Sequence, residues 1–163
     1  MLRAHLLAVA ALSITPACGL TSHSSHSSQL DGAFEYKSYG GYFGGTMMLH
    51  VEPDGSAVKD ETPARTTPDD VPMTTTTHGT VATDLMDTMR KDVAAVDLAD
   101  FEHADYDCSH YKCGFDGGTD ELHIDADGKT YEIYVDQNIS WSDLPSGLTK
   151  LIQDMHVVGA AVR

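Results

Sequence analysis

The segment TDELHIDADGKTYEIYV, which spans Thr119–Val135, decides the fold class because apolar and polar residues alternate on both sides of a turn. Alternation with a period of two places successive side chains on opposite faces of a β-strand. Leu122 and Ile124 therefore share one face of the first strand. The turn at Asp125–Lys129 contains Asp-Gly, which favours a tight hairpin. The second strand of this predicted hairpin places three apolar residues on one face: Tyr131, Ile133 and Val135.

Earlier in the chain, a second group of strands is predicted. The segment FEYKSY at Phe34–Tyr39 alternates aromatic and polar residues, and Thr46–Val51 and Ser56–Lys59 are rich in residues that favour strands. Pro53-Asp54-Gly55 lies between the last two segments. Because proline fixes one φ angle and glycine supplies a positive one, this tripeptide predicts the turn of a hairpin.

Each group of strands is followed by a predicted helix. The first spans Thr80–Val96, where Thr80 or Thr83 could cap the start. Its apolar residues recur at steps of three and four, as on one face of a helix: Val81, Leu85, Met86, Met89, Val93 and Val96. Ser142–Pro145 opens a last helix, since proline suits a first helical turn. The apolar face of that helix is Leu148, Leu151, Ile152 and Met155.

The order hairpin, helix, hairpin, helix predicts an α+β fold. An antiparallel sheet from two β-hairpins, with two helices packed on one face, buries all four apolar surfaces at once. We assign this single domain to residues 33–163. Within it, residues 60–79 hold three prolines and a run of threonines without any period. So long a connection predicts either a disordered loop or a binding loop.

The beginning of the chain has the features of an export signal. Residues 1–17 combine Arg3 with an apolar run that is shorter than the roughly 20 residues needed to span a bilayer. Thr15-Pro16-Ala17-Cys18 resembles a bacterial lipobox, which implies a lipid on Cys18 and anchoring to the cell envelope, at the outer membrane or cell surface rather than the inner membrane. The alternative is an ordinary signal peptide that leaves Cys18 as a spare thiol. Residues 18–32 are predicted to form a flexible Ser/His tether, in which His23 and His26 offer only a weak metal site.

The other two cysteines, Cys108 and Cys113, are five positions apart. If Cys18 carries lipid, an even pair remains, and in an exported protein such a pair favours a disulfide. His103 and His110 lie nearby, so a zinc site built on the same cysteines is the alternative.

Charge and motifs exclude several classes of function. The chain has 10 Lys and Arg against 25 Asp and Glu, a formal net charge of −15, so nucleic acid would repel it. It contains no HExxH, GxSxG, P-loop or dinucleotide-binding motif. We therefore expect no enzyme activity, no catalytic residue, no resident metal and no cofactor. A protein partner and a membrane reached through Cys18 are the expected contacts.

The segment YGGYFGG, from Tyr39 to Gly45, is the best candidate for a partner-binding loop. Glycines surround two adjacent aromatic residues between strand-like runs. The proposed contact residues are Gly40, Gly41, Tyr42, Phe43 and Gly44. Two interpretations remain open: the rings protrude as anchors for a partner, or they fold back onto the core.

Several of these motifs resemble the emfourin family, small protein inhibitors of thermolysin-type metalloproteases. Ser38–Gly44 is similar to that family's Ser-Gly-Gly-aromatic-Ala-Gly, and the resemblance continues through the following helix, Asp127–Asp136 and Leu144–Pro145 to Ile152. It implies an inhibitor whose glycine-aromatic loop meets the protease. The lipid anchor, residues 60–79 and the cysteine segment depart from the family pattern. A cell-envelope interaction or structural lipoprotein without a protease target is the second hypothesis.

Overall fold

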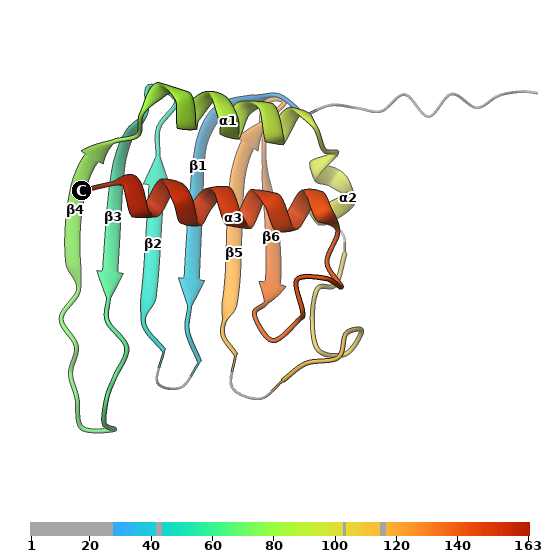
Figure 1. Ribbon diagram of the computed structural model, residues 1–163. Helices are drawn as coiled ribbons and strands as arrows, with labels where there is room; N and C mark the ends of the chain where they lie inside the picture. The colour runs from blue at the N-terminus through green and yellow to red at the C-terminus, as the bar shows by residue number, and fades with distance from the viewer. Residues whose placement is uncertain (1–27, 42–43, 103, 115–116) are drawn as a thin grey trace, which may run out of the picture.

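The computed structural model describes residues 28–41, 44–102, 104–114 and 117–163 (Figure 1). Its centre is a six-stranded antiparallel sheet in the order β4-β3-β2-β1-β5-β6. The first four strands form a meander, after which the chain returns across the sheet and inserts β5 beside β1. The strands are β1 (Leu30–Tyr39), β2 (Thr46–Val51), β3 (Ser56–Thr62), β4 (Thr75–Thr80), β5 (Thr119–Ala126) and β6 (Lys129–Asp136).

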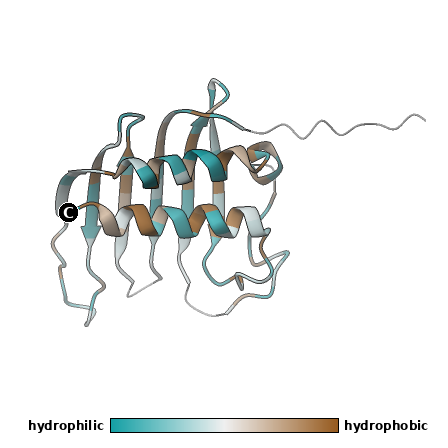
Figure 2. Cartoon of the chain, turned by 45° about the horizontal axis from the view of Figure 1, so that its top comes forward, coloured by the Kyte–Doolittle hydropathy of each residue, from teal (hydrophilic) through white to brown (hydrophobic). Residues whose placement is uncertain are grey.

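Two long helices lie side by side across one face of the sheet, as Figures 1 and 2 show. They are α1 (Thr83–Ala94) and α3 (Ser146–Ala161), and the short helix α2 (Leu98–Glu102) follows α1. Among the described residues, no helix has both the length and the apolar content needed to cross a membrane. The fold is therefore α+β with its helices on one side of an antiparallel sheet, which confirms the predicted architecture.

The core lies between the sheet and the two long helices. The apolar residues that alternation places on one face of β5 and β6 are buried, as is the predicted apolar face of α3. Met86 and Met89 of α1 are 3% and 0% exposed, which confirms that they fill the core. Burial on this scale removes apolar surface from water and is the main stabilising contribution to the fold. The largest fully buried side chains include Tyr36, Phe34, Leu49, Met89 and Leu98.

The sheet contains more strands than two hairpins supply, because β4 lies within the stretch predicted as a loop. Residues 60–62 complete β3 and residues 75–79 belong to β4, so the connection shrinks to residues 63–74. Thr75–Thr80 pairs with β3 along its whole length, from Glu61↔Thr75 to Ser56↔Thr80. Threonine is β-branched and favours strands, but its polar hydroxyl hides the apolar alternation on which the prediction relied.

The predicted tether is also shorter at its C-terminal end. Ser28 is 2% exposed, its backbone N–H donates to Val96 O, and its Oγ accepts from Leu98 N at the start of α2. β1 begins at Leu30, opposite Ala126 of β5. Residues 28–32 are therefore part of the domain, held by hydrogen bonds that their polar composition did not reveal. The predicted signal peptide, Cys18 and both tether histidines lie in residues 1–27, outside the described residues.

Helix α1 starts without the predicted threonine cap. Thr80 is the last residue of β4 and Thr83 is the first residue of the helix, so the N-cap position falls to Ala82, which has no side chain able to accept a hydrogen bond. The helix is held instead by burial of its apolar face.

Candidate functional site

Four connections gather at one end of the sheet, which we call the loop end (Figure 1). They are the described parts of residues 40–45, 63–74, 103–118 and 137–145, which join β1 to β2, β3 to β4, α2 to β5 and β6 to α3. The opposite end carries the two tight turns, where Gly55 and Gly128 have φ angles of 86° and 74°. The loop end therefore holds most of the irregular surface, where binding residues commonly lie.

The predicted contact loop is closed by a narrow crossing of its two arms. Gly40 N–H donates to Gly45 O at 2.8 Å, and Gly44 N–H donates to Gly41 O at 2.7 Å. A Cβ atom at Gly40 would lie 2.5 Å from the Cα of Gly44, closer than a real Cβ approaches another atom. A side chain at Gly40 would therefore collide with the backbone of the opposite arm, so this position requires glycine. Tyr42 and Phe43 lie outside the described residues, so both interpretations of their rings stay predictions.

This glycine loop is wedged between two neighbouring connections. A Cβ atom at Gly45 would lie 2.6 Å from Thr62 O, and one at Gly118 would lie 1.3 Å from Tyr39 O. Residues 63–74 therefore lie on one side of the loop and the segment before β5 on the other. Close backbone packing on both sides fixes the base of the loop before any partner arrives.

A shallow groove of about 270 Å³ opens between the glycine loop, the start of the 63–74 connection and α3. Pockets for small molecules usually have volumes of about 300–1,000 Å³, so this groove suits a side chain of a partner better than a free ligand. The groove is lined by Ser38, Gly45, Thr46, Met47, Glu61, Thr62, Pro63, Ala64 and His156.

Beneath the groove lies a polar network that the sequence analysis missed. The buried Tyr36 hydroxyl donates to Asp120 Oδ1 at 2.8 Å and lies 2.9 Å from His156 Nε2. Gln137 Nε2 donates to the same Asp120 oxygen at 2.7 Å and to Ser38 Oγ at 2.8 Å. The network ties β1, β5, the 137–145 connection and α3 together directly under the loop end. One signal was available, because Asp120 occupies an apolar-face position in the alternation of β5.

Burial and the adjacent Asp120 carboxylate raise the pKa of Tyr36 far above its ordinary value of 10.0. Burial disfavours the phenolate, and both the charge of Asp120 and its hydrogen bond favour the neutral phenol. Tyr36 therefore acts as a fixed hydrogen-bond donor. The network therefore holds β1, β5, the 137–145 connection and α3 in position, and the neutral phenol of Tyr36 is not a nucleophile.

The 63–74 connection is organised by Asp70. Its carboxylate accepts from Thr66 N at 2.7 Å and Thr67 N at 2.8 Å, and also from the Thr66 hydroxyl. These hydrogen bonds lower the pKa of Asp70 to about 2. The loop therefore has local structure, and it presents Val71 and Met73 to solvent at 89% and 83% exposure.

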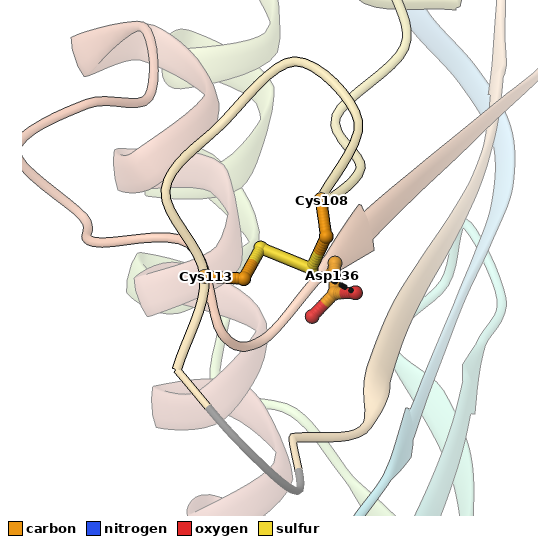
Figure 3. Close-up of side chains that lie close together, drawn as sticks. All are labelled: Cys108, Cys113 and Asp136. Atoms are coloured by element: carbon orange, nitrogen blue, oxygen red, sulfur yellow. Dashed lines mark hydrogen bonds between the residues drawn. A yellow bond between two sulfur atoms is a disulfide. The ribbon is translucent and has the colours of Figure 1, made fainter.

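The structure joins Cys108 and Cys113 in a disulfide, with Asp136 beside it (Figure 3). Asp136 Oδ2 lies 3.0 Å from Cys108 Sγ, and Asp136 Oδ1 accepts from Asn138 N at 2.8 Å. The flanking residues pair with the rest of the fold through Tyr106↔Val135 and Cys113↔Ile139. The bridge therefore fastens the cysteine segment beside the end of β6.

The geometry gives little support to the alternative interpretation of this region as a zinc site. Three potential ligand groups, the two sulfurs and the Asp136 carboxylate, lie within 4.8 Å of one another, but bonded sulfurs offer no thiolate to a metal. His110 Nδ1 is 3.2 Å from Asp107 Oδ1, and His103 lies outside the described residues. A disulfide is compatible with an extracytoplasmic location.

Comparison with known proteins leaves the site to be interpreted from its own geometry. No protein-family model matches the chain, and no match to it was found among curated protein sequences.

Proposed function

We propose that the protein is an exported, lipid-anchored binding module whose loop end contacts a protein partner, in the manner of an emfourin-like inhibitor of a thermolysin-type metalloprotease. The observation that carries the proposal is the glycine crossing at Gly40 and Gly44, packed between two other connections. A loop whose base is already fixed loses little conformational entropy on binding, which favours affinity. The proposed role is non-enzymatic and needs no cofactor.

The surroundings of the loop support a protein partner. The groove beside it is open and small, and exposed Val71 and Met73 extend the apolar surface on the 63–74 connection. Protein interfaces concentrate their binding energy in a few apolar or aromatic anchors. Tyr42 and Phe43 would supply such anchors at the centre, with the groove receiving a side chain of the partner.

The direction in which the chain enters the domain supports an anchored module. β1 begins at the end of the sheet opposite to the loop end, where Asp127 N–H donates to Gln29 O at 3.0 Å (Figure 1). If Cys18 carries lipid, residues 19–27 can reach at most about 30 Å when extended. The membrane would then face the turn end, and the loop end would point outward, at the outer membrane or cell surface.

The test is a titration of a thermolysin-type protease with the chain that begins at Gly19, which contains every described element. We expect stoichiometric loss of protease activity and an inhibitor that stays uncleaved. Changing Tyr42 and Phe43 to Ala together should raise the inhibition constant by about 30-fold or more, because loss of an interface anchor costs about 2 kcal/mol or more. Tyr134→Ala, which removes a half-exposed ring from β6, is the matched control.

Two results would contradict the proposal. Unfolding of the Tyr42 and Phe43 variant, seen by circular dichroism, would place these rings in the core. Absence of inhibition by the folded wild-type chain at micromolar concentration would favour the second hypothesis, an envelope interaction or structural lipoprotein. Labelling of the intact protein with palmitate in cells, abolished by Cys18→Ala, tests the anchor separately.

A further inference from the structure

The face of the sheet opposite to α1 and α3, which we call the open face, carries a row of ionisable side chains. On β1, Phe34 and Tyr36 are buried beneath the helices, so alternation places Glu35 and Lys37 on the open face. The strand register then continues the row through β2, β5 and β6. Its members on these four strands are Glu35, Lys37, His50, Glu121, His123 and Glu132.

Two histidines in this row flank one carboxylate. Glu35 of β1 is directly opposite His50 of β2 on one side and His123 of β5 on the other. Directly opposed residues have Cβ atoms about 4.5–5.5 Å apart, so the three side chains rise from adjacent points of the sheet. His50 Nδ1 lies 3.8 Å from Glu35 Oε2. Two ligands of one tetrahedral metal ion, each bonded at about 2.1 Å, lie about 3.4 Å apart.

His50 is already oriented as metal-binding histidines are. Its Nε2 lies 3.0 Å from Glu52 Oε1, which fixes that nitrogen as the proton-bearing donor. Nδ1, which lies 3.8 Å from Glu35 Oε2, then carries the lone pair that a metal ion needs. A carboxylate that holds the second ring nitrogen is the usual partner of a histidine ligand.

His123 supplies an independent observation. Its Nε2 is buried and has no hydrogen-bond partner among the described residues, and its distance to Glu121 Oε2 is 4.0 Å. Nearly all buried polar atoms in proteins are paired, and an unpaired one indicates a missing partner. A metal ion would satisfy this nitrogen after the His123 side chain turns toward Glu35, because the ligand atoms of Glu35, His50 and His123 do not all lie within 4.8 Å of one another.

We propose that His50, Glu35 and His123 form a site for a divalent transition metal ion such as Zn²⁺ on the open face. Two imidazoles and a carboxylate suit Zn²⁺ or Cu²⁺ better than Ca²⁺ or Mg²⁺, which prefer oxygen ligands. Lys37 Nζ, now 2.6 Å from Glu35, is the competing cation and would leave when the metal binds. The remaining coordination position would hold water or Glu121.

The test is a Zn²⁺ titration of the chain that begins at Gly19, in competition with a chromophoric chelator. We expect one ion per chain at this site, and His50→Ala, His123→Ala and Glu35→Gln should each weaken binding about tenfold or more. Lys37→Met should strengthen binding, because it removes the competing ammonium. His78→Ala is the matched control. His78 also lies on the open face, but on β4, two strands away from His50.

Several results would overturn the site. Zn²⁺ binding that is unchanged in the His50 and His123 variants contradicts it, as does binding that is lost only when both tether histidines, His23 and His26, are changed to Ser. Weaker binding by Lys37→Met also contradicts it, because removing an ammonium ion that competes for Glu35 must strengthen metal binding there. If a histidine variant fails to fold, Glu52→Gln provides a second test, because it leaves all three ligands present and should still weaken binding.

Discussion

Tyr36 joins Asp120 to His156 in the network beneath the loop end. Changing Tyr36 to Phe keeps the ring but removes the donor to Asp120 and the partner of His156. We expect the free energy of unfolding to fall by about 1–3 kcal/mol, because Asp120 stays nearly buried and, among the described residues, keeps only Gln137 as a side-chain partner. Urea denaturation at pH 7 measures this loss.

The raised pKa of Tyr36 also predicts how stability depends on pH. In the unfolded chain the phenol ionises near pH 10, whereas the folded protein keeps it neutral to a higher pH. Its contribution is therefore complete below pH 10 and is lost as the pH rises toward the folded pKa. The stability advantage of wild type over Tyr36→Phe should shrink between pH 9.5 and 11. An advantage that stays constant over this range would show that Tyr36 ionises normally.

At the scale of elements, the helices and strands that could be predicted from the sequence are those whose apolar residues recur regularly. The β5–β6 hairpin and both long helices could be predicted because their apolar residues recur with a period of 2 or 3.6. The turn at Asp54-Gly55 could be predicted from its proline and glycine. β4 could not, because an edge strand of threonines shows no such period. The glycine loop was found from composition. The network around Asp120 required knowledge of which strands are neighbours, and β1 pairs with β5 across 80 or more residues of sequence.

The packing of α1 on α3 contains a carboxylate whose ionisation works against the fold. Burial, together with a hydrogen bond to Asp92 of α1, raises the pKa of Asp154, and Lys150 only partly offsets this. A raised carboxyl pKa contributes stability that is present at low pH and is lost as pH rises through the folded pKa. We therefore expect Asp154→Asn to be more stable relative to wild type at pH 7 than at pH 3. Thermal unfolding at both pH values measures the difference, and Asp87→Asn on the exposed side of α1 is the control.

The whole molecule has two different ends and two different faces. The chain enters beside the tight turns, the glycine loop lies at the other end, and the helices leave one sheet face open (Figure 1). The proposed partner contact and the proposed metal site therefore use separate surfaces. Loss of Zn²⁺ binding through His50→Ala should leave protease inhibition unchanged, so the two proposals can fail independently.

The net charge of −15 acts on the molecule as a whole. Carboxylates outnumber cations more than twofold, so mutual repulsion destabilises the compact state at low ionic strength. The screening length falls from about 30 Å at 0.01 M salt to about 10 Å at 0.1 M, which weakens long-range repulsion more than the short ion pairs such as Lys150–Asp92 at 3.0 Å. We expect the melting temperature to rise between 0.01 M and 0.3 M NaCl, and to rise less in a non-ionic solute of equal osmolality. A fall in melting temperature with NaCl would mean that local ion pairs outweigh the repulsion, and the excess of carboxylates would then contribute to solubility without a cost in stability.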